Sequence, residues 1–135
     1  MRTLEESRAF FHGDRFALEA CGIAIDEVGD GEAKCSMPLT PLHLNAAGVA
    51  QGGAVYTLCD TAFAVAANAG GALTVSLGAN ITYLRPGTGG RLFAVARRLS
   101  EGRTTCLYRI EVTDEKGALV AFATVNGFRR AAPGA

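Results

Sequence analysis

The sequence predicts an α+β domain in which a mostly antiparallel sheet wraps around one long central helix. Two observations lead to this prediction. Residues 52–68 form an apolar stretch of helical length without a polar face, and a helix of that kind has to be covered by other elements. Segments with strand character lie on both sides of it, two before and four after, and a curved sheet can supply the cover.

The chain before the central helix predicts short helices followed by a hairpin. Residues 3–20 combine leucines and phenylalanines with charges at roughly helical spacing, interrupted by one glycine, which indicates one or two amphipathic helices on the outside of the fold. Alternating runs at 22–28 and 32–38 flank a Gly-Asp-Gly sequence and predict two hairpin strands. Pro38 and Pro41 then break the chain before an irregular connection.

Four further strands are predicted after the central helix, which a Gly-Gly pair ends. The strand-like stretches are separated by turn sequences and lie at 73–86, 91–100, 105–114 and 118–130. A short Ala/Gly/Pro tail follows. Such a sheet keeps a free edge and the helix a free flank, which favours association of two copies. We therefore expect residues 1–135 to form a single domain that dimerises.

Composition excludes several classes of function. Thirteen basic and 13 acidic residues give zero formal net charge, so no overall field attracts nucleic acid or an anionic membrane. The four cysteines form no Cys-x-x-Cys pair and do not cluster with the two histidines, so no metal site is predicted. No segment has the pattern of a signal peptide or a membrane span. We expect a cytoplasmic protein that uses no metal or redox cofactor and has no nucleic-acid or membrane partner.

One charged residue lies in the most apolar part of the chain. Asp60 is the only Asp, Glu, Lys or Arg from Cys35 through Leu84, and it lies in the middle of the predicted helix. An uncompensated buried carboxylate costs several kcal/mol, so such a residue normally has a partner or a chemical task. The alternative to a catalytic role is a structural acid bonded to the hydroxyl of Thr57 or Thr61.

The sequence around Asp60 resembles a family signature. Residues 45–68, NAAGVAQGGAVYTLCDTAFAVAAN, resemble the helix-opening motif of the hot-dog-fold acyl-CoA thioesterases of the phenylacetate-pathway type. The later stretches ITYLRPG and GRTTCLYRIEV resemble the strand end and the hairpin return of the same family. One position departs from the pattern, because Gln51 replaces the histidine that precedes Gly-Gly. An amide does not titrate near neutral pH, so we expect Gln51 to position groups.

The resemblance implies a hot-dog fold and hydrolysis of acyl-CoA or aryl-acyl-CoA thioesters to free acid and coenzyme A. Asp60 matches the catalytic carboxylate of the family, as general base or nucleophile. Gly52 matches the glycine whose backbone N–H points at the thioester carbonyl. Asn45 matches a polar residue that places the carbonyl or water, although a turn-forming role is an equal alternative for an asparagine in a loop.

Thioester hydrolysis requires an oxyanion stabiliser and a base or nucleophile. Unpaired N–H groups at the start of a helix, near Gly52 and Gly53, can supply the first, and Asp60 the second. Eight residues at a rise of about 1.5 Å place Asp60 about 12 Å along the helix from Gly52, too far for both to reach one carbonyl. Two antiparallel helices at a two-fold interface solve this problem. We expect a homodimer with shared active sites, assembled into a tetramer of two dimers.

Other residues are candidates for binding the coenzyme A thioester. For its phosphates the candidates are cationic or hydroxyl side chains, with Arg103 and Thr104 favoured over Arg85, Arg97, Arg98 and Thr105. For the acyl group they are Tyr56, Phe63 and Val65.

Two other functions stay open at this stage. A hot-dog hydratase or dehydratase would use a histidine together with an acid, but His43 is better interpreted as a surface or turn histidine. A non-catalytic acyl-CoA-binding module would tolerate Gln51 in place of the histidine.

Overall fold

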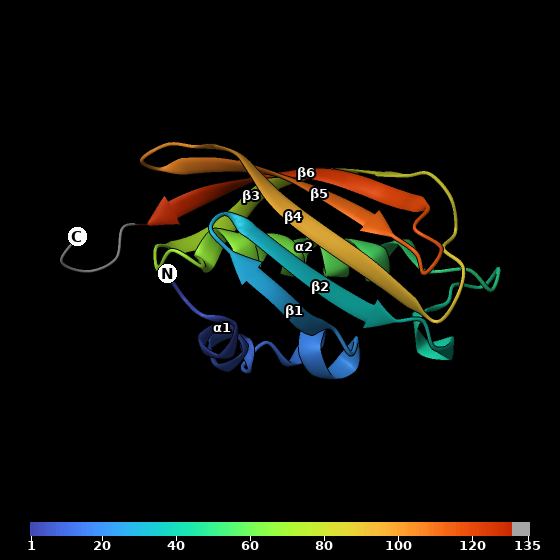
Figure 1. The fold of residues 1–135 in the computed structure, drawn as a ribbon. Coiled ribbons are helices and arrows are strands. Elements are labelled where there is room, and N and C mark those ends of the chain that lie inside the picture. The colour runs from blue at the N-terminus through green and yellow to red at the C-terminus, as the bar shows by residue number, and fades with distance from the viewer. Residues whose placement is uncertain (131–135) are drawn as a thin grey trace.

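Six antiparallel strands curve around one long helix in the computed structural model, which describes residues 1–130 (Figure 1). In chain order the elements are α1 (Leu4–Phe11), a π-helical turn (Phe16–Ala20), β1 (Ala24–Gly29), β2 (Glu32–Pro38), a 3-10 turn (Pro41–His43), α2 (Gly52–Asn68), β3 (Leu73–Tyr83), β4 (Arg91–Glu101), β5 (Thr105–Thr113) and β6 (Leu119–Arg130). The strand order is β1-β2-β4-β5-β6-β3. The predicted α+β architecture is confirmed, and the Ala/Gly/Pro tail lies outside the described residues.

The N-terminal elements form as the sequence predicts. Thr3 and Glu6 close a capping box at the start of α1, each side chain accepting a hydrogen bond from the other's backbone N–H. Gly31, with a φ of +65°, makes the tight turn between β1 and β2. The guanidinium of Arg8 donates two hydrogen bonds, of 3.1 and 2.9 Å, to the carbonyl oxygen of Ile25. This contact fixes α1 against β1, at one edge of the sheet.

The core lies between α2 and the concave face of the sheet. On the helix side, Leu58 and Phe63 are fully buried, and on the sheet side Leu92, Ile110 and Val125 meet them. Burying a side chain of this size contributes about 1.5–3 kcal/mol to stability. The cover is incomplete, because a helical stripe that carries Asp60 stays half-exposed along α2, at Tyr56, Thr57, Asp60, Ala64 and Ala67.

The β3 edge of the sheet is open. β3 pairs with β6 on one side only and also packs against α2. Apolar side chains stay exposed along it, with Val75 55% and Leu77 61% accessible. A long apolar edge strand of this kind is suited to pair with another chain. No helix within residues 1–130 has the length and apolar character to span a bilayer.

Candidate active site

Gln51 fixes the start of α2. Its side-chain oxygen accepts a 2.9 Å hydrogen bond from the backbone N–H of Ala54, which makes Gln51 the N-cap of the helix. Its own backbone N–H donates to the carbonyl oxygen of His43 at 2.8 Å. The side chain lies so close to the next turn that a Cβ on Gly53 would be 2.8 Å from its oxygen. Gln51 therefore has a positioning role for the helix start itself.

Two backbone donors are left open at this helix start. Within residues 1–130, the N–H groups of Gly52 and Gly53 have no hydrogen-bond partner. The positive end of the helix dipole adds to their attraction for negative charge. Space beside Gly52 is tight, because a Cβ there would lie 3.3 Å from the ring of Tyr83. The arrangement can bind an anion or a polarised carbonyl oxygen.

Asp60 lies on the half-exposed stripe of α2, without a hydrogen bond or ion pair to any residue from 1 to 130. Burial raises the pKa of its carboxyl group, and the negative charge of Asp14 raises it further. The alternative structural role is not supported, since the hydroxyl of Thr57 donates to Gly53 O at 2.7 Å and that of Thr61 to Thr57 O at 2.8 Å. Asp60 is therefore a half-exposed carboxyl group without a partner among residues 1–130.

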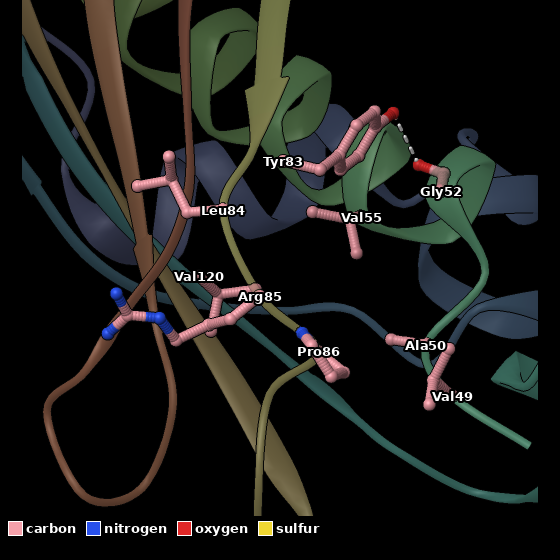
Figure 2. A pocket seen from close by; sticks show the side chains of 9 residues that line it. All are labelled: Val49, Ala50, Gly52, Val55, Tyr83, Leu84, Arg85, Pro86 and Val120. Carbon is pink, nitrogen blue, oxygen red and sulfur yellow. Dashed lines mark hydrogen bonds between the residues drawn. The ribbon is translucent and has the colours of Figure 1, made fainter.

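Two cavities flank the first turn of α2. One, of about 330 Å³, lies between this turn and the end of β3 and is lined mostly by apolar side chains, among them Val49, Ala50, Val55, Tyr83, Pro86 and Val120 (Figure 2). The other, of about 450 Å³, lies against Gly53 on the side of the π-helical turn. Gly52 lines the first cavity and Gly53 the second, so there is space on both sides of the helix start.

The loop before Gln51 is organised by its own polar residues. The side-chain oxygen of Asn45 accepts hydrogen bonds from the N–H groups of Ala47 (2.9 Å) and Val49 (3.2 Å), so Asn45 is a turn-forming residue in this chain. Its amide NH₂ group has no partner within residues 1–130 and can still donate to a ligand.

His43 is a turn histidine, one of the two alternatives predicted for it, and it is buried. Its side chain is 5% exposed. One ring nitrogen lies 2.7 Å from the carbonyl oxygen of Cys21, and the other lies 2.9 Å from the hydroxyl of Thr40 and accepts its N–H at 3.1 Å. Because both nitrogens are occupied, the ring ties the 3-10 turn to the N-terminal segment.

Several predicted binding residues lie away from this region. Phe63 and Val65 are buried in the core, and Phe63 packs edge-on against Tyr108 at 5.5 Å. The acyl-group candidates that the sequence suggested therefore include two core residues, and only Tyr56 lies on the open stripe beside Asp60. Tyr83, which the sequence did not single out, lines the cavity instead.

The phosphate candidates are divided between the two ends of α2: Arg85 lines the apolar cavity beside Gly52, and the others lie at the opposite end. Arg103 and Thr104 occupy the exposed turn between β4 and β5, where Arg129 N–H donates to Thr104 O at 2.8 Å. Arg97 and Arg98 are held in ion pairs with Glu32, Asp30 and Glu101. Arg103 has no ion pair within residues 1–130 and keeps its guanidinium available.

Comparisons with known proteins agree with this geometry. Residues 47–121 match the thioesterase superfamily. The acyl-coenzyme A thioesterase PaaI of Escherichia coli is 35% identical over 118 residues, which are 87% of this chain and 84% of that protein. The structure of PaaI from the E. coli phenylacetic acid degradation operon matches with a TM-score of 0.88 and 30% identity, covering 95% of this chain and 94% of the other.

A second solved structure carries a ligand. A hypothetical thioesterase protein of Streptococcus pneumoniae, solved with coenzyme A, matches with a TM-score of 0.82 and 28% identity over 92% of this chain and 99% of the other. The chain therefore belongs to the thioesterase superfamily, and within it to the hot-dog-fold acyl-CoA thioesterases of the PaaI type. It is a thioester hydrolase.

Proposed function

We propose that the protein hydrolyses acyl-CoA or aryl-acyl-CoA thioesters, with Asp60 as general base or nucleophile and the Gly52 N–H polarising the carbonyl. The observation that carries this proposal is that two sets of polar groups on one helix lack hydrogen-bond partners within residues 1–130. Open N–H donors lie at the start of α2, and a half-buried carboxyl group without a partner lies on its uncovered flank. Each group supplies what the other lacks for cleaving a thioester.

The reaction follows from these two groups. The thioester oxygen lies against the open N–H groups while Asp60 accepts a proton from a water molecule whose oxygen attacks the carbonyl carbon. As the C–S bond breaks, coenzyme A leaves as a thiolate and takes up the proton. In the alternative route, a carboxylate oxygen of Asp60 attacks the carbon itself, the C–S bond breaks to release coenzyme A thiolate, and water then cleaves the resulting anhydride to the free acid and the Asp60 carboxylate. The raised pKa of Asp60 makes it a better proton acceptor than an exposed aspartate.

The two groups of one site come from two subunits in this proposal. About 12 Å of helix separates Gly52 from Asp60 within a chain. Contacts at both ends show that α2 runs antiparallel to β3, since Tyr83 bonds to Gly52 and Thr74 to Asn68. Pairing two β3 edges about a two-fold axis places two α2 helices antiparallel, flank to flank. Asp60 of each chain then faces the helix start of its partner, and two such dimers form the proposed tetramer.

The same two-fold arrangement would place the β4–β5 turn, with its candidate phosphate-binding residues, near the site of the partner subunit. Thr104 is bonded to Arg129, and Leu73 at the start of β3 pairs with Arg130, so the β4–β5 turn lies at the α2 C-terminal end. Across the axis, that end of one subunit lies beside the helix start of the other. We propose that Arg103, with the hydroxyl of Thr104, binds the phosphates of coenzyme A there.

The apolar cavity beside Gly52 supports a small or aromatic acyl group as the substrate. The test is release of free thiol, followed with a thiol dye, from benzoyl-, phenylacetyl- and straight-chain acyl-CoAs. Turnover that is lost in Asp60→Asn supports the proposal. Tight binding of every thioester without thiol release would instead identify a non-catalytic acyl-CoA-binding module.

Subunit mixing tests the shared site. Asp60→Ala and Gly52→Val proteins are each expected to be nearly inactive alone. When they are unfolded and refolded together, random pairing about a two-fold axis makes about a quarter of all sites free of either lesion. Activity should return to about that fraction of the wild-type value. Activity that stays at the level of the separate mutants would show that each chain builds its own site.

A further inference from the structure

The two open N–H groups at the start of α2 belong to different peptide groups, and the carbonyls of those peptides have different partners. Gly52 N–H shares its peptide with the Gln51 carbonyl, which accepts hydrogen bonds from Ala54 N–H (3.0 Å) and Val55 N–H (3.2 Å). Gly53 N–H shares its peptide with the Gly52 carbonyl. That oxygen accepts a 2.9 Å hydrogen bond from the hydroxyl of Tyr83, which lies 31 residues away in the chain (Figure 2).

A hydrogen bond to a carbonyl oxygen changes the N–H group of the same peptide. It draws electron density toward the oxygen and makes that N–H a stronger donor, which is the origin of cooperativity in hydrogen-bond chains. It also fixes the rotation of the peptide plane, and so the direction of the N–H. Backbone bonds of the helix do this for both peptides, since Gly52 lies inside α2 and its carbonyl also accepts the helical bond from four residues on. The hydroxyl of Tyr83 is an additional donor, and it acts on the Gly52 carbonyl alone, the one that shares its peptide with Gly53 N–H.

The Tyr83 contact is poorly explained by stability alone. Tyr83 is 49% exposed, so its hydroxyl could bond to water, and a hydrogen bond at such a position contributes only about 1 kcal/mol. Yet its ring is packed so closely on Gly52 that a Cβ there would be 3.3 Å away, and the same ring forms a wall of the apolar cavity. The hydrogen bond from Tyr83 to Gly52 therefore lies where we expect the substrate carbonyl to bind.

We propose that Tyr83 is a positioning residue that orients and strengthens Gly53 N–H as a second donor to the substrate carbonyl oxygen. The oxyanion is then held by two backbone N–H groups, one from Gly52 and one from Gly53. This inference rests on the proposed function and deepens it. The Tyr83 phenol is protonated at neutral pH and can donate, since burial and the neighbouring Cys59 raise its pKa above an ordinary value of 10.0 that is already well above neutral.

Binding of two coenzyme A analogues to the wild-type protein and to Tyr83→Phe tests the inference. One analogue is a methyl ketone in which a CH₂ group replaces the thioester sulfur, so it keeps the carbonyl. The other is an S-alkyl thioether of the same length without a carbonyl. In Tyr83→Phe the ring stays and the bond to Gly52 O is lost. The ketone should bind about three- to tenfold more weakly and the thioether within about twofold of wild type, as expected for loss of one indirect oxyanion interaction.

The fall in turnover rate should match the fall in affinity for the ketone analogue. We expect kcat for a CoA thioester to fall by a similar factor in Tyr83→Phe, with KM nearly unchanged. The matched control is Tyr108→Phe, which removes a tyrosine hydroxyl beside Arg98 at the other end of α2 and should leave the ratio of the two affinities unchanged.

Three outcomes would overturn the inference. Unchanged ketone binding in Tyr83→Phe would show that the carbonyl does not depend on Tyr83. Equal weakening of both analogues would show that Tyr83 acts only as a cavity wall. A wild-type protein that binds neither analogue and cleaves no CoA thioester would overturn the proposed function together with the inference, so the failures are distinguishable.

Discussion

The two ends of α2 differ in whether their terminal backbone groups have hydrogen-bond partners. At the C-terminal end, the amide of Asn68 donates to Ala64 O (2.8 Å) and Thr74 O (3.1 Å) and accepts from Thr74 N–H (2.9 Å). Arg2 closes the same end, where its backbone N–H donates to Ala69 O at 2.6 Å and its guanidinium to Asn68 O. At the N-terminal end, Gln51 provides the cap, and the next two N–H groups stay open.

We call the C-terminal end of α2, around Asn68, the closed end, and the N-terminal end, at Gly52 and Gly53, the open end. The closed end is arranged for stability and the open end for binding. Cations and donors at the C-terminal end satisfy the last carbonyls and the negative end of the dipole, which stabilises the fold. The N-terminal end keeps its positive end and its donors for a ligand, at some loss of stability. Mutations at the closed end should therefore change the free energy of unfolding, and mutations toward the open end should change catalysis.

The largest effect is expected at Asp60. Asp60→Asn keeps the shape of the side chain but removes the proposed base or nucleophile, so kcat should fall by about a hundredfold or more while the fold is retained. Thiol release under saturating substrate measures the loss, and circular dichroism checks the fold. A folded variant with wild-type turnover would remove Asp60 from the mechanism.

The closed end should respond in the opposite way. Asn68→Ala removes three hydrogen bonds and leaves buried backbone groups of Thr74 without a partner, so the free energy of unfolding should fall by about 2–3 kcal/mol. Below the unfolding transition, kcat should stay within about twofold of wild type, because no group of the open end is touched. Urea unfolding and thiol release, measured on the same preparation, check both parts. A large fall in kcat with unchanged stability would contradict the division between the two ends.

Substitution of Arg103 tests whether a residue near the closed end of one subunit binds substrate at the open end of the other. Arg103→Ala should raise KM for full coenzyme A thioesters by about tenfold and leave KM for truncated pantetheine thioesters unchanged, since only the former carry nucleotide phosphates. Arg109→Ala is the control, because Arg109 is paired with Glu111. Equal changes with both substrates would place Arg103 away from the phosphates.

Much of the fold could be predicted because its signals are local. An apolar stretch without a polar face defined α2 with the bounds that the structure shows, and Gly31 marked the first hairpin. The strand at 73–86 was predicted for the same reason, although in the structure it ends at Tyr83. The open flank of the helix followed from the topology rather than from its residues, since only the strand order shows that the sheet leaves the Asp60 stripe uncovered.

The candidate site was predictable only in part. Gly52 and Asp60 lie in one sequence motif, whereas the Tyr83 contact depends on where β3 ends relative to α2, which no local pattern contains. Phe63 was a candidate because it is a large apolar residue of the central helix, from which a pocket wall was expected. The structure places it in the core because Gly127 leaves space for its ring, where a Cβ would be 2.8 Å away.

The smallest effect expected is a pH-dependent change in stability at Asp60. The folded protein holds the pKa of this carboxyl above the ordinary value of 3.8, so the folded state binds the proton more tightly than the unfolded chain does. Below that ordinary value both states are protonated and the residue contributes no difference. As pH rises through it and through the raised value, the folded state is destabilised by its ionised carboxylate, and the loss is complete above the raised pKa.

Asp60→Asn removes this penalty, since an amide does not ionise. The variant should therefore be more stable than wild type at pH 7, and the difference should shrink to nothing at about pH 3, where Asp60 is neutral in both states. Asp14→Asn should give part of the same gain at neutral pH, because the charge of Asp14 is the second cause of the shift. Urea midpoints at both pH values measure these differences. A variant less stable than wild type at pH 7 would show that the assembled protein provides Asp60 with a stabilising partner, and the open end of α2 would then contribute to stability as the closed end does.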